Sequence, residues 1–233
     1  MQQSIGSESK IYKESNVQRD NIYPGDPQGL PDDTLVFFDS GFLSKLSKHF
    51  GNGRYISYDF TKLASHLAKK QKLICKRIYY FTAPPFQSDS STHDENIRRM
   101  KYDLFISKIK KSPLIKVEEG RVQRIKNEAG KYVFKQKGVD ALIIMRLSFI
   151  PLDFPEIKKV ILVSSDTDFC PVIRELQQKN VEVILYSYHE RKRGTSFSVS
   201  TELIKCCFKY IKLTKEDFEV STLHNHSKEN LSE

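Results

Sequence analysis

The sequence predicts an α/β fold, in which strands alternate with helices around a mostly parallel central sheet. Short runs rich in β-branched and aromatic residues recur between segments whose apolar residues have helical spacing. That alternation is typical of parallel strands joined by helical crossovers. Acidic residues follow three of the predicted elements, and they are Asp39, Asp140, Asp166 and Asp168. Because ligands bind at the carboxyl ends of strands in open α/β sheets, these aspartates mark the expected site.

The first predicted elements are a strand, two helices and a second strand. Residues 35–38 form an apolar run, and Ser40-Gly41 favours a tight exit into a helix. Asp59 is placed to cap the next helix, whose inward positions recur at helical spacing. Residues 76–81 read as the following strand, which the two prolines at 84–85 bring to an end.

The middle of the chain predicts a long basic helix, a hairpin and a buried helix. Residues 94–111 carry apolar side chains at helical intervals, with lysines and arginines on the other faces. Residues 115–125 and 132–136 are β-like and are separated by a turn sequence, which indicates an inserted β-hairpin. The apolar run 141–150 has no clear periodicity, and its context favours a buried helix.

The last elements continue the alternation to residue 213. They are a strand over 160–164, a helix over 168–179, a strand over 181–186 and a helix over 201–210. The chain is therefore divided into an arm expected to be disordered (1–33), one domain (34–213) and a polar tail (214–233). A length of 233 residues with 39% hydrophobic content suits one domain with a sizeable core.

The charge balance favours a polyanionic partner. Lysine and arginine number 38 against 29 aspartates and glutamates, a formal charge of +9. Nucleic acid is the expected partner of such a surface. The alternative is ordinary surface lysine. A second copy of the chain or another protein also stays open as a partner.

The four cysteines predict buried, reduced thiols rather than a zinc site or disulfides. They form no C-x-x-C pair and have no histidine at zinc-finger spacing. Reduced thiols suit a reducing compartment. The N-terminal segment lacks the apolar core of a secretory signal, and no apolar run approaches the roughly 18 residues of a membrane span. We therefore expect a cytoplasmic protein.

Carboxylates gathered at one edge of a sheet repel each other unless a cation binds between them. Magnesium prefers oxygen ligands, and it often takes only one or two carboxylates directly while keeping several waters. A metal site of this kind can activate water and neutralise charge on a phosphate, which phosphodiester hydrolysis requires. Asp39 and Asp166 are the expected direct ligands. Asp140 and Asp168 would then act through water or orient the nucleophile.

Three ordered segments resemble the NYN domain family of PIN-like (LabA-like) nucleases. That family has an apolar strand ending in Asp, a Lys-Gly-Val-Asp element and a Ser-Gly-Asp-Ser-Asp-Phe element. Here the segments read VFFDSG at 36–41, KGVD at 137–140 and SSDTDF at 164–169. The resemblance spans about residues 35–213. No segment is specific alone, because a strand followed by D-x-D also occurs in other metal sites.

The resemblance implies a PIN-like three-layer α/β/α sandwich and a ribonuclease. Its acidic pocket would bind Mg²⁺ or Mn²⁺ and cleave RNA phosphodiesters, with endonucleolytic cleavage expected. The catalytic and metal-binding set would be the four aspartates. Residues expected to contact RNA or to orient the carboxylates are Lys137, Ser164, Ser165, Thr167, Arg98, Arg99, Arg191 and Arg193.

Each of these residues also has a purely structural interpretation. Asp39 and Asp166 are placed to end their strands with Asx turns, and Asp140 and Asp168 to cap the helices that follow. The serines and Thr167 suit a solvated turn, and the basic residues suit solubilising surface charge.

The chain departs from the family pattern at four positions. Phe42 stands where Asn is usual, and Ser165 stands where Gly is usual. Arg146 and Phe208 occupy positions where relatives commonly carry an acid. An Arg146 side chain that entered the pocket would pair with a carboxylate and take the place of a metal's charge. Phe42 and Arg146 are therefore expected to modify the pocket.

Three functions stay open from the sequence. The first is a metal-dependent ribonuclease that uses the four aspartates. The alternative is a catalytically impaired NYN domain that serves as an RNA-binding or protein-scaffold module. A phosphatase of the haloacid dehalogenase type is the third, although its D-x-D belongs on the first core strand and Asp166-Thr167-Asp168 comes late.

Overall fold

The computed structural model describes residues 31–190 and 197–223. Its centre is a six-stranded sheet in the order β3-β2-β1-β6-β7-β8, and every neighbouring pair in it is parallel. The strands are β1 (Asp33–Asp39), β2 (Ile74–Thr82), β3 (Ile115–Glu119), β6 (Lys159–Val163), β7 (Glu182–Ser187) and β8 (Lys209–Lys212). The predicted mostly parallel sheet is confirmed.

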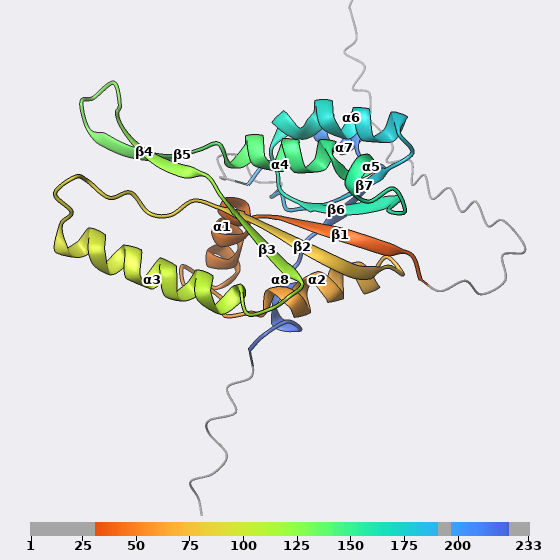
Figure 1. The fold of residues 1–233 in the computed structure, drawn as a ribbon, viewed down its shortest axis with the longest axis horizontal. Coiled ribbons are helices and arrows are strands. Elements are labelled where there is room, and N and C mark those ends of the chain that lie inside the picture. Colours follow the sequence, from red (N-terminus) through yellow and green to blue (C-terminus); the bar gives the residue numbers. More distant parts are fainter. Residues whose placement is uncertain (1–30, 191–196, 224–233) are drawn as a thin grey trace, which may run out of the picture. The chain divides into compact units, whose positions relative to one another are not determined.

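Helices cover both faces of this sheet, which gives the three layers visible in Figure 1. One layer holds α1 (Ser40–Phe50), α2 (Phe60–Lys69), α3 (His93–Ile109) and α8 (Lys215–Glu219). The other holds α4 (Val139–Ser148), α5 (Ile150–Asp153), α6 (Cys170–Gln178) and α7 (Thr201–Cys206). A short 3-10 helix, η1 (Thr167–Phe169), precedes α6. The architecture is the expected PIN-like α/β/α sandwich.

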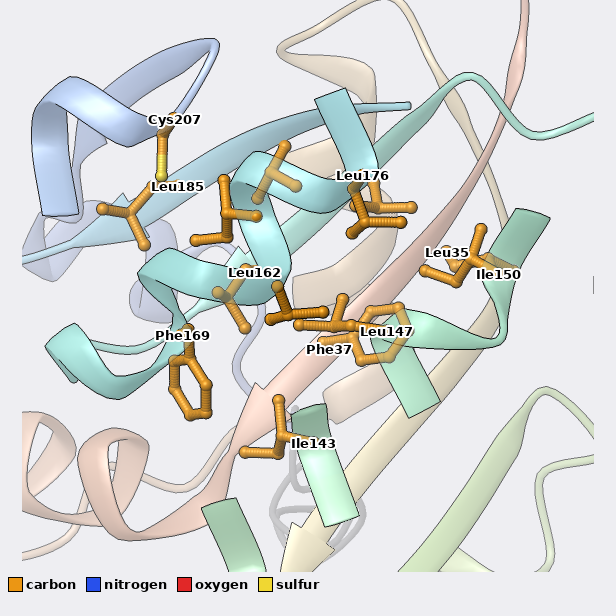
Figure 2. Close-up of a cluster of buried hydrophobic side chains, with 14 of the residues drawn as sticks. Leu35, Phe37, Ile143, Leu147, Ile150, Leu162, Phe169, Leu176, Leu185 and Cys207 are labelled. Carbon is orange, nitrogen blue, oxygen red and sulfur yellow. The ribbon is translucent and has the colours of Figure 1, made fainter. Parts of the chain in front are cut away.

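The side-chain alternation of each strand divides the core in two. On β1, Leu35 and Phe37 face α4 and α6, whereas Val36 and Phe38 face α1 and α2. Both pairs are fully buried, which explains why the strand reads as a continuous apolar run. Figure 2 shows the first cluster, where side chains of β1 and β6 meet α4 and α6.

The strand order places a switch point between β1 and β6. From β1 the chain crosses to β2 on one side, whereas from β6 it crosses to β7 on the other. At such a point the connections diverge and leave a crevice outside the carboxyl ends of the two strands. Asp39 ends β1, and residues 164–168 follow β6 at the same edge. The topology therefore brings two of the acidic segments together.

The hairpin differs from the prediction in its extent. Residues Ile115–Glu119 form β3, which pairs in parallel with β2. Only β4 (Arg121–Lys126) and β5 (Tyr132–Lys137) form the antiparallel hairpin. Gly120 separates the two roles, because a Cβ there would lie 2.6 Å from the backbone oxygen of Lys137. The single predicted strand over 115–125 is therefore wrong.

Two further predictions of local structure are corrected. The helix expected over 201–210 stops at Cys206, and the chain continues as β8, parallel to β7. The segment 214–233, expected to be a polar tail, begins with α8, whose Phe218 is fully buried. Its short length and four charged or polar neighbours hid this single apolar anchor.

The basic helix α3 is less amphipathic than its sequence spacing indicates. Its capping box between Thr92 and Glu95 forms, but only Glu95 and Ile106 are buried. Met100 and Leu104 are 56% and 61% exposed. The apolar residues of 141–150 are likewise only partly inside, since Met145 is 41% exposed while Ile143 and Leu147 are buried.

The predictions for the N-terminal segment and the cysteines can also be set against the structure. Of the predicted arm 1–33, residues 1–30 lie outside the described part, and Asp33 already belongs to β1. All four cysteines are free, and three of them are buried. In the described ranges, no helix combines the length and apolar character needed to cross a bilayer.

Candidate active site

Asp39 is held at the end of β1 by hydrogen bonds to both carboxylate oxygens. Oδ1 accepts from the backbone N–H groups of Gly41 at 3.0 Å and Phe42 at 3.2 Å, which caps α1. Oδ2 accepts from the Ser164 hydroxyl at 2.8 Å. The expected Asx turn is thus formed by Oδ1, while Oδ2 reaches a residue 125 positions away.

Ser164 joins the two acidic strand ends. Its side chain is fully buried at the end of β6, and its hydroxyl donates to Asp39. The same oxygen accepts a long hydrogen bond of 3.4 Å from the backbone N–H of Asp166. Ser164 therefore orients a carboxylate and has no free hydroxyl proton for a ligand.

Asp166 shapes the turn that follows β6. Its Oδ1 accepts from the backbone N–H of Asp168 at 2.9 Å and caps η1. Thr167 and Asp168 lie in that 3-10 helix, with Asp168 exposed, and Ser165 is partly buried beside them. This tight Asx turn holds two carboxylates within three residues.

Asp140 arrives from the other side, in the first turn of α4. The N-cap of that helix is Gly138, whose φ of 80° is left-handed and suits glycine. Asp140 is exposed and does not cap α4, and Asp168 does not cap α6, whose N-cap is Phe169 without a side-chain hydrogen bond. The capping interpretation therefore fails for both residues.

Asp39 and Asp140 lie close enough to the other aspartates for those negative charges to affect their pKa values. Burial raises the pKa of Asp39 against the lowering effect of its hydrogen bonds, and the charge of Asp166 raises it further. Loss of solvation and then repulsion from Asp166, Asp39 and Asp168 raise the pKa of Asp140. Strand ends and a helix start thus converge into one acidic crevice, made of Asp39, Asp140, Asp166 and Asp168.

The crevice is not a closed metal cage. In the described part of the chain, no group of three or more His, Cys, Asp or Glu side chains is arranged to hold an ion. Its donors are all carboxylate oxygens, which suit Mg²⁺ or Mn²⁺. The residues present therefore fit an ion held by one or two carboxylates and otherwise by water.

The other residues singled out in the sequence are spread around this crevice. Lys137 is exposed at the end of β5, three residues before Asp140. Arg98 borders a groove beside the hairpin. Arg99 is committed to Asp103, which accepts from its Nε at 2.9 Å and 3.0 Å. Arg191 and Arg193 lie outside the described residues.

Phe42 and Arg146, which were expected to modify the pocket, do not fill the crevice. Arg146 pairs with Glu118 at 2.7 Å and approaches Asp153 at 3.9 Å, with its guanidinium over the ring of Tyr79. The idea that it replaces a metal's charge is therefore not supported. Phe42 is 6% exposed and packs into the core with α1 and α2.

Phe208 is also away from the aspartates. Its backbone N–H donates to Val183 near the start of β7, directly before β8 begins. In a parallel sheet this is the amino edge, opposite the edge where Asp39 and Asp166 lie. Its 54% exposed ring therefore cannot modify the crevice.

The structure adds Gln136 to the site. A Cβ built on Gly41 would lie 3.4 Å from Gln136 Oε1 and 3.3 Å from Asp39 Oδ1, so that amide reaches the edge of the crevice. Sequence reasoning overlooked Gln136, because its direction depends on the pairing of β4 with β5. Strand alternation would have found it once that register was known.

The family model for the NYN domain matches residues 34–214. The chain belongs to the NYN domain family. This is a PIN-like, nuclease-type family whose members generally depend on divalent metal ions. Among curated proteins, no sequence matches this NYN domain.

Among solved structures that match, one illustrates the shared fold. It is a protein of unknown function from Vibrio parahaemolyticus RIMD 2210633, which is 15% identical and has a TM-score of 0.51. The match covers 83% of this NYN protein and 99% of that chain. At this level of identity the likeness concerns the fold alone.

Proposed function

We propose that this NYN protein is a metal-dependent ribonuclease, an endonuclease that hydrolyses RNA phosphodiesters in the acidic crevice. The observation that carries the proposal is the convergence of β1 and β6 at the switch point, where Ser164 donates to Asp39 and the Asp166 turn follows directly. Membership of a nuclease-type family supports the same reaction class.

Asp39 and Asp166 are the residues proposed to hold Mg²⁺ or Mn²⁺. In each residue, Oδ1 accepts a hydrogen bond from a nearby backbone N–H group. This bond fixes the rotamer of the side chain and therefore the direction of Oδ2. An ion held by these two carboxylates would supply an activated water and neutralise charge on the attacked phosphate. Burial raises the pKa of Asp39 and the charge of Asp166 adds to this, and a bound cation would offset that repulsion.

Asp140 and Asp168 are proposed to act on the attacking water. Both carboxylates are exposed, and neither serves as the cap of its helix, so both are available to accept a proton or a hydrogen bond. A raised pKa at Asp140 brings it closer to the working pH of a general base. Lys137 lies nearby in sequence and is proposed to contact a phosphate of the RNA.

The proposal is tested with an Asp39→Asn, Asp166→Asn double variant. Cleavage of labelled single-stranded and structured RNA in Mn²⁺ or Mg²⁺ should fall by at least about 100-fold, because both proposed ligands lose their charge. Glu175→Gln is the matched control, since that carboxylate on α6 is exposed and pairs with Lys179 at the C-cap of the helix. Undiminished cleavage by the double variant would exclude this site.

A noncatalytic RNA-binding role is the second candidate. The observation that favours it is the absence of a three-ligand cage in the described residues. It predicts salt-sensitive RNA binding that persists in excess chelator, without turnover in any metal.

A further inference from the structure

An aromatic and basic groove lies next to the acidic crevice. Its walls are the loop after β2, the exposed side of α3 and one face of the β4–β5 hairpin, and its volume is about 440 Å³. Figure 1 shows the hairpin extending beyond the sheet, with the loop after β2 and α3 facing it. We call it the hairpin groove, and it is lined by Phe86, Arg98, Tyr102, Val122, Phe134 and Gln136.

The register of the hairpin directs one set of side chains into this groove. Val122 pairs with Gln136, and Arg124 pairs with Phe134, two residues farther along each strand. Because alternate residues share a face, these four lie together, and the next pair on that face includes Tyr132. The groove surface is thus a regular consequence of strand alternation.

The aromatic rings of this face are left open to solvent. Phe134 is 52% exposed and Tyr132 is 55% exposed. Phe86 lies with its ring centroid 5.4 Å from that of Phe134. The Arg124 guanidinium lies 5.1 Å from the Phe86 ring and 4.6 Å from the Tyr132 ring. Rings and a planar guanidinium gathered in this way are the surfaces on which nucleobases stack.

The charge of the hairpin favours a polyanion. Residues 121–137 contain six lysines and arginines but only one acidic residue, Glu128, and two of these cations, Arg124 and Lys126, share the groove face. Arg98 adds a cation from α3. Such a basic surface attracts a phosphate backbone, while an apolar peptide would gain nothing from it.

Gln136 is the residue at which the groove meets the edge of the crevice. Gln136 lines the groove, and its Oε1 lies beside Gly41 and Asp39 at the end of β1. A nucleic-acid strand with one phosphate at the aspartates would therefore place a neighbouring nucleotide against the hairpin. The bases must be unpaired to reach the rings, because a duplex hides their faces.

We propose that the hairpin groove binds the bases of single-stranded RNA next to the phosphate that is cleaved. The stacking surface is formed by Phe86, Arg124, Tyr132 and Phe134, and Arg98 contacts the backbone. This subsite rests on the proposed ribonuclease activity, but its binding step needs no metal and is measured separately.

The test is the affinity for a 5′-fluorescein-labelled 12-nucleotide single-stranded RNA, measured by fluorescence anisotropy in EDTA. Phe134→Ala should weaken binding about tenfold, which is the size of one lost base–aromatic stack. Phe134→Tyr should restore the affinity because it keeps a ring, whereas Phe134→Leu should not. Arg124→Ala should both weaken binding and reduce its dependence on salt.

Phe208→Ala is the matched control. Its ring is 54% exposed, like that of Phe134, but it lies at the opposite edge of the sheet. This variant should bind the RNA as the unchanged protein does. Thermal unfolding of each variant verifies that the fold is kept.

Three results would overturn the subsite: equal affinity of Phe134→Ala and the unchanged protein, equally tight binding of the same RNA annealed to its complement, or no RNA binding at all. In the last case an acidic protein would be the better occupant. Loss of binding in Phe134→Ala without aspartate-dependent cleavage would support the subsite and reject the nuclease. Aspartate-dependent cleavage with normal binding by Phe134→Ala would do the reverse.

Discussion

Two aspartates of this protein occupy protected positions with opposite surroundings. Asp217 on α8 is almost fully buried and is met by Lys70 Nζ at 2.7 Å and His66 Nε2 at 2.9 Å. Asp39 at the end of β1 accepts hydrogen bonds only from neutral groups, and Asp166 lies near enough to repel it. Among the described residues, no lysine or arginine forms an ion pair with Asp39.

The pKa values follow this difference. Burial alone would raise the pKa of Asp217, but hydrogen bonds from Lys70, the Thr214 backbone and His66 outweigh it and lower the pKa. Burial raises the pKa of Asp39, and its hydrogen bonds do not compensate. A carboxylate that stabilises the fold is thus supplied by the chain with a cation, Lys70, and with hydrogen-bond donors. The crevice carries uncompensated negative charge, as expected where a cation comes from solution.

The largest expected effect is at the paired aspartate. Asp217→Ala should lower the free energy of unfolding by about 2–3 kcal/mol, because charge-assisted hydrogen bonds from Lys70 and His66 and the cap of α8 are lost together. Urea unfolding at pH 7 measures the loss. Asp103→Ala is the control, since its pair with Arg99 is exposed and should be worth less than about 1 kcal/mol.

The pH dependence of this difference has a defined sign. Because the pKa of Asp217 is lowered on folding, its stabilisation is present above the pKa of an unfolded aspartate, about 3.9. It is lost as the pH falls through the lower folded value. The gap between the unchanged protein and Asp217→Ala should therefore shrink in acid. A gap that stayed constant to pH 2 would contradict the role of the charge.

The second effect concerns the ion itself. At a Mn²⁺ concentration ten times its Kd, the unchanged protein should gain about 1.4 kcal/mol of stability, a Tm rise of about 3–5 °C. The Asp39→Asn, Asp166→Asn variant should gain nothing, while Asp217→Asn should still respond. Differential scanning fluorimetry with and without EDTA measures these shifts. A response unchanged in the double variant would place the ion elsewhere.

The gathering of aspartates in the crevice could be predicted from the sequence. The apolar run before Asp39 and the one before Asp166 predict two strands of one parallel sheet, and strand ends gather at one edge in such a sheet. Their adjacency is seen only in the structure. Asp217 was missed for a physical reason. Its helix has five residues and one buried apolar side chain, so the sequence contains no apolar periodicity that would predict the helix.

Features of the site that the sequence did not predict also depend on tertiary contacts. The hairpin was predicted, but the division of residues 115–125 between β3 and β4 depends on a close backbone approach at Gly120. The roles of Gln136 and Phe134 follow only from that register. Arg146 was expected near the crevice by its position after Asp140, yet Glu118 at the end of β3 attracts it. Tertiary charge partners of this kind leave no local pattern.

The smallest expected effect is on the stability of the protein when Asp39, the aspartate that lacks a cation partner among the described residues, is neutralised. In EDTA at pH 7, Asp39→Asn should raise the free energy of unfolding by about 0.5–1 kcal/mol, as neutralised active-site charges often do. The amide oxygen still accepts from Gly41 and Phe42, so the cap of α1 is kept. The folded pKa of Asp39 is raised, so its ionised form destabilises the fold only above the pKa of an unfolded aspartate. The stability gained by the variant should therefore be absent near pH 3 and grow towards neutrality. Stability that comes from the ionised form of Asp217 depends on pH in the opposite sense, because the pKa of that group is lowered.

Urea unfolding between pH 3 and 7 measures the pH dependence for Asp39→Asn, with Asp103→Asn as the surface control. A variant less stable than the unchanged protein at pH 7 would show that the hydrogen bond from Ser164 outweighs the repulsion, and the contrast with Asp217 would then be one of degree.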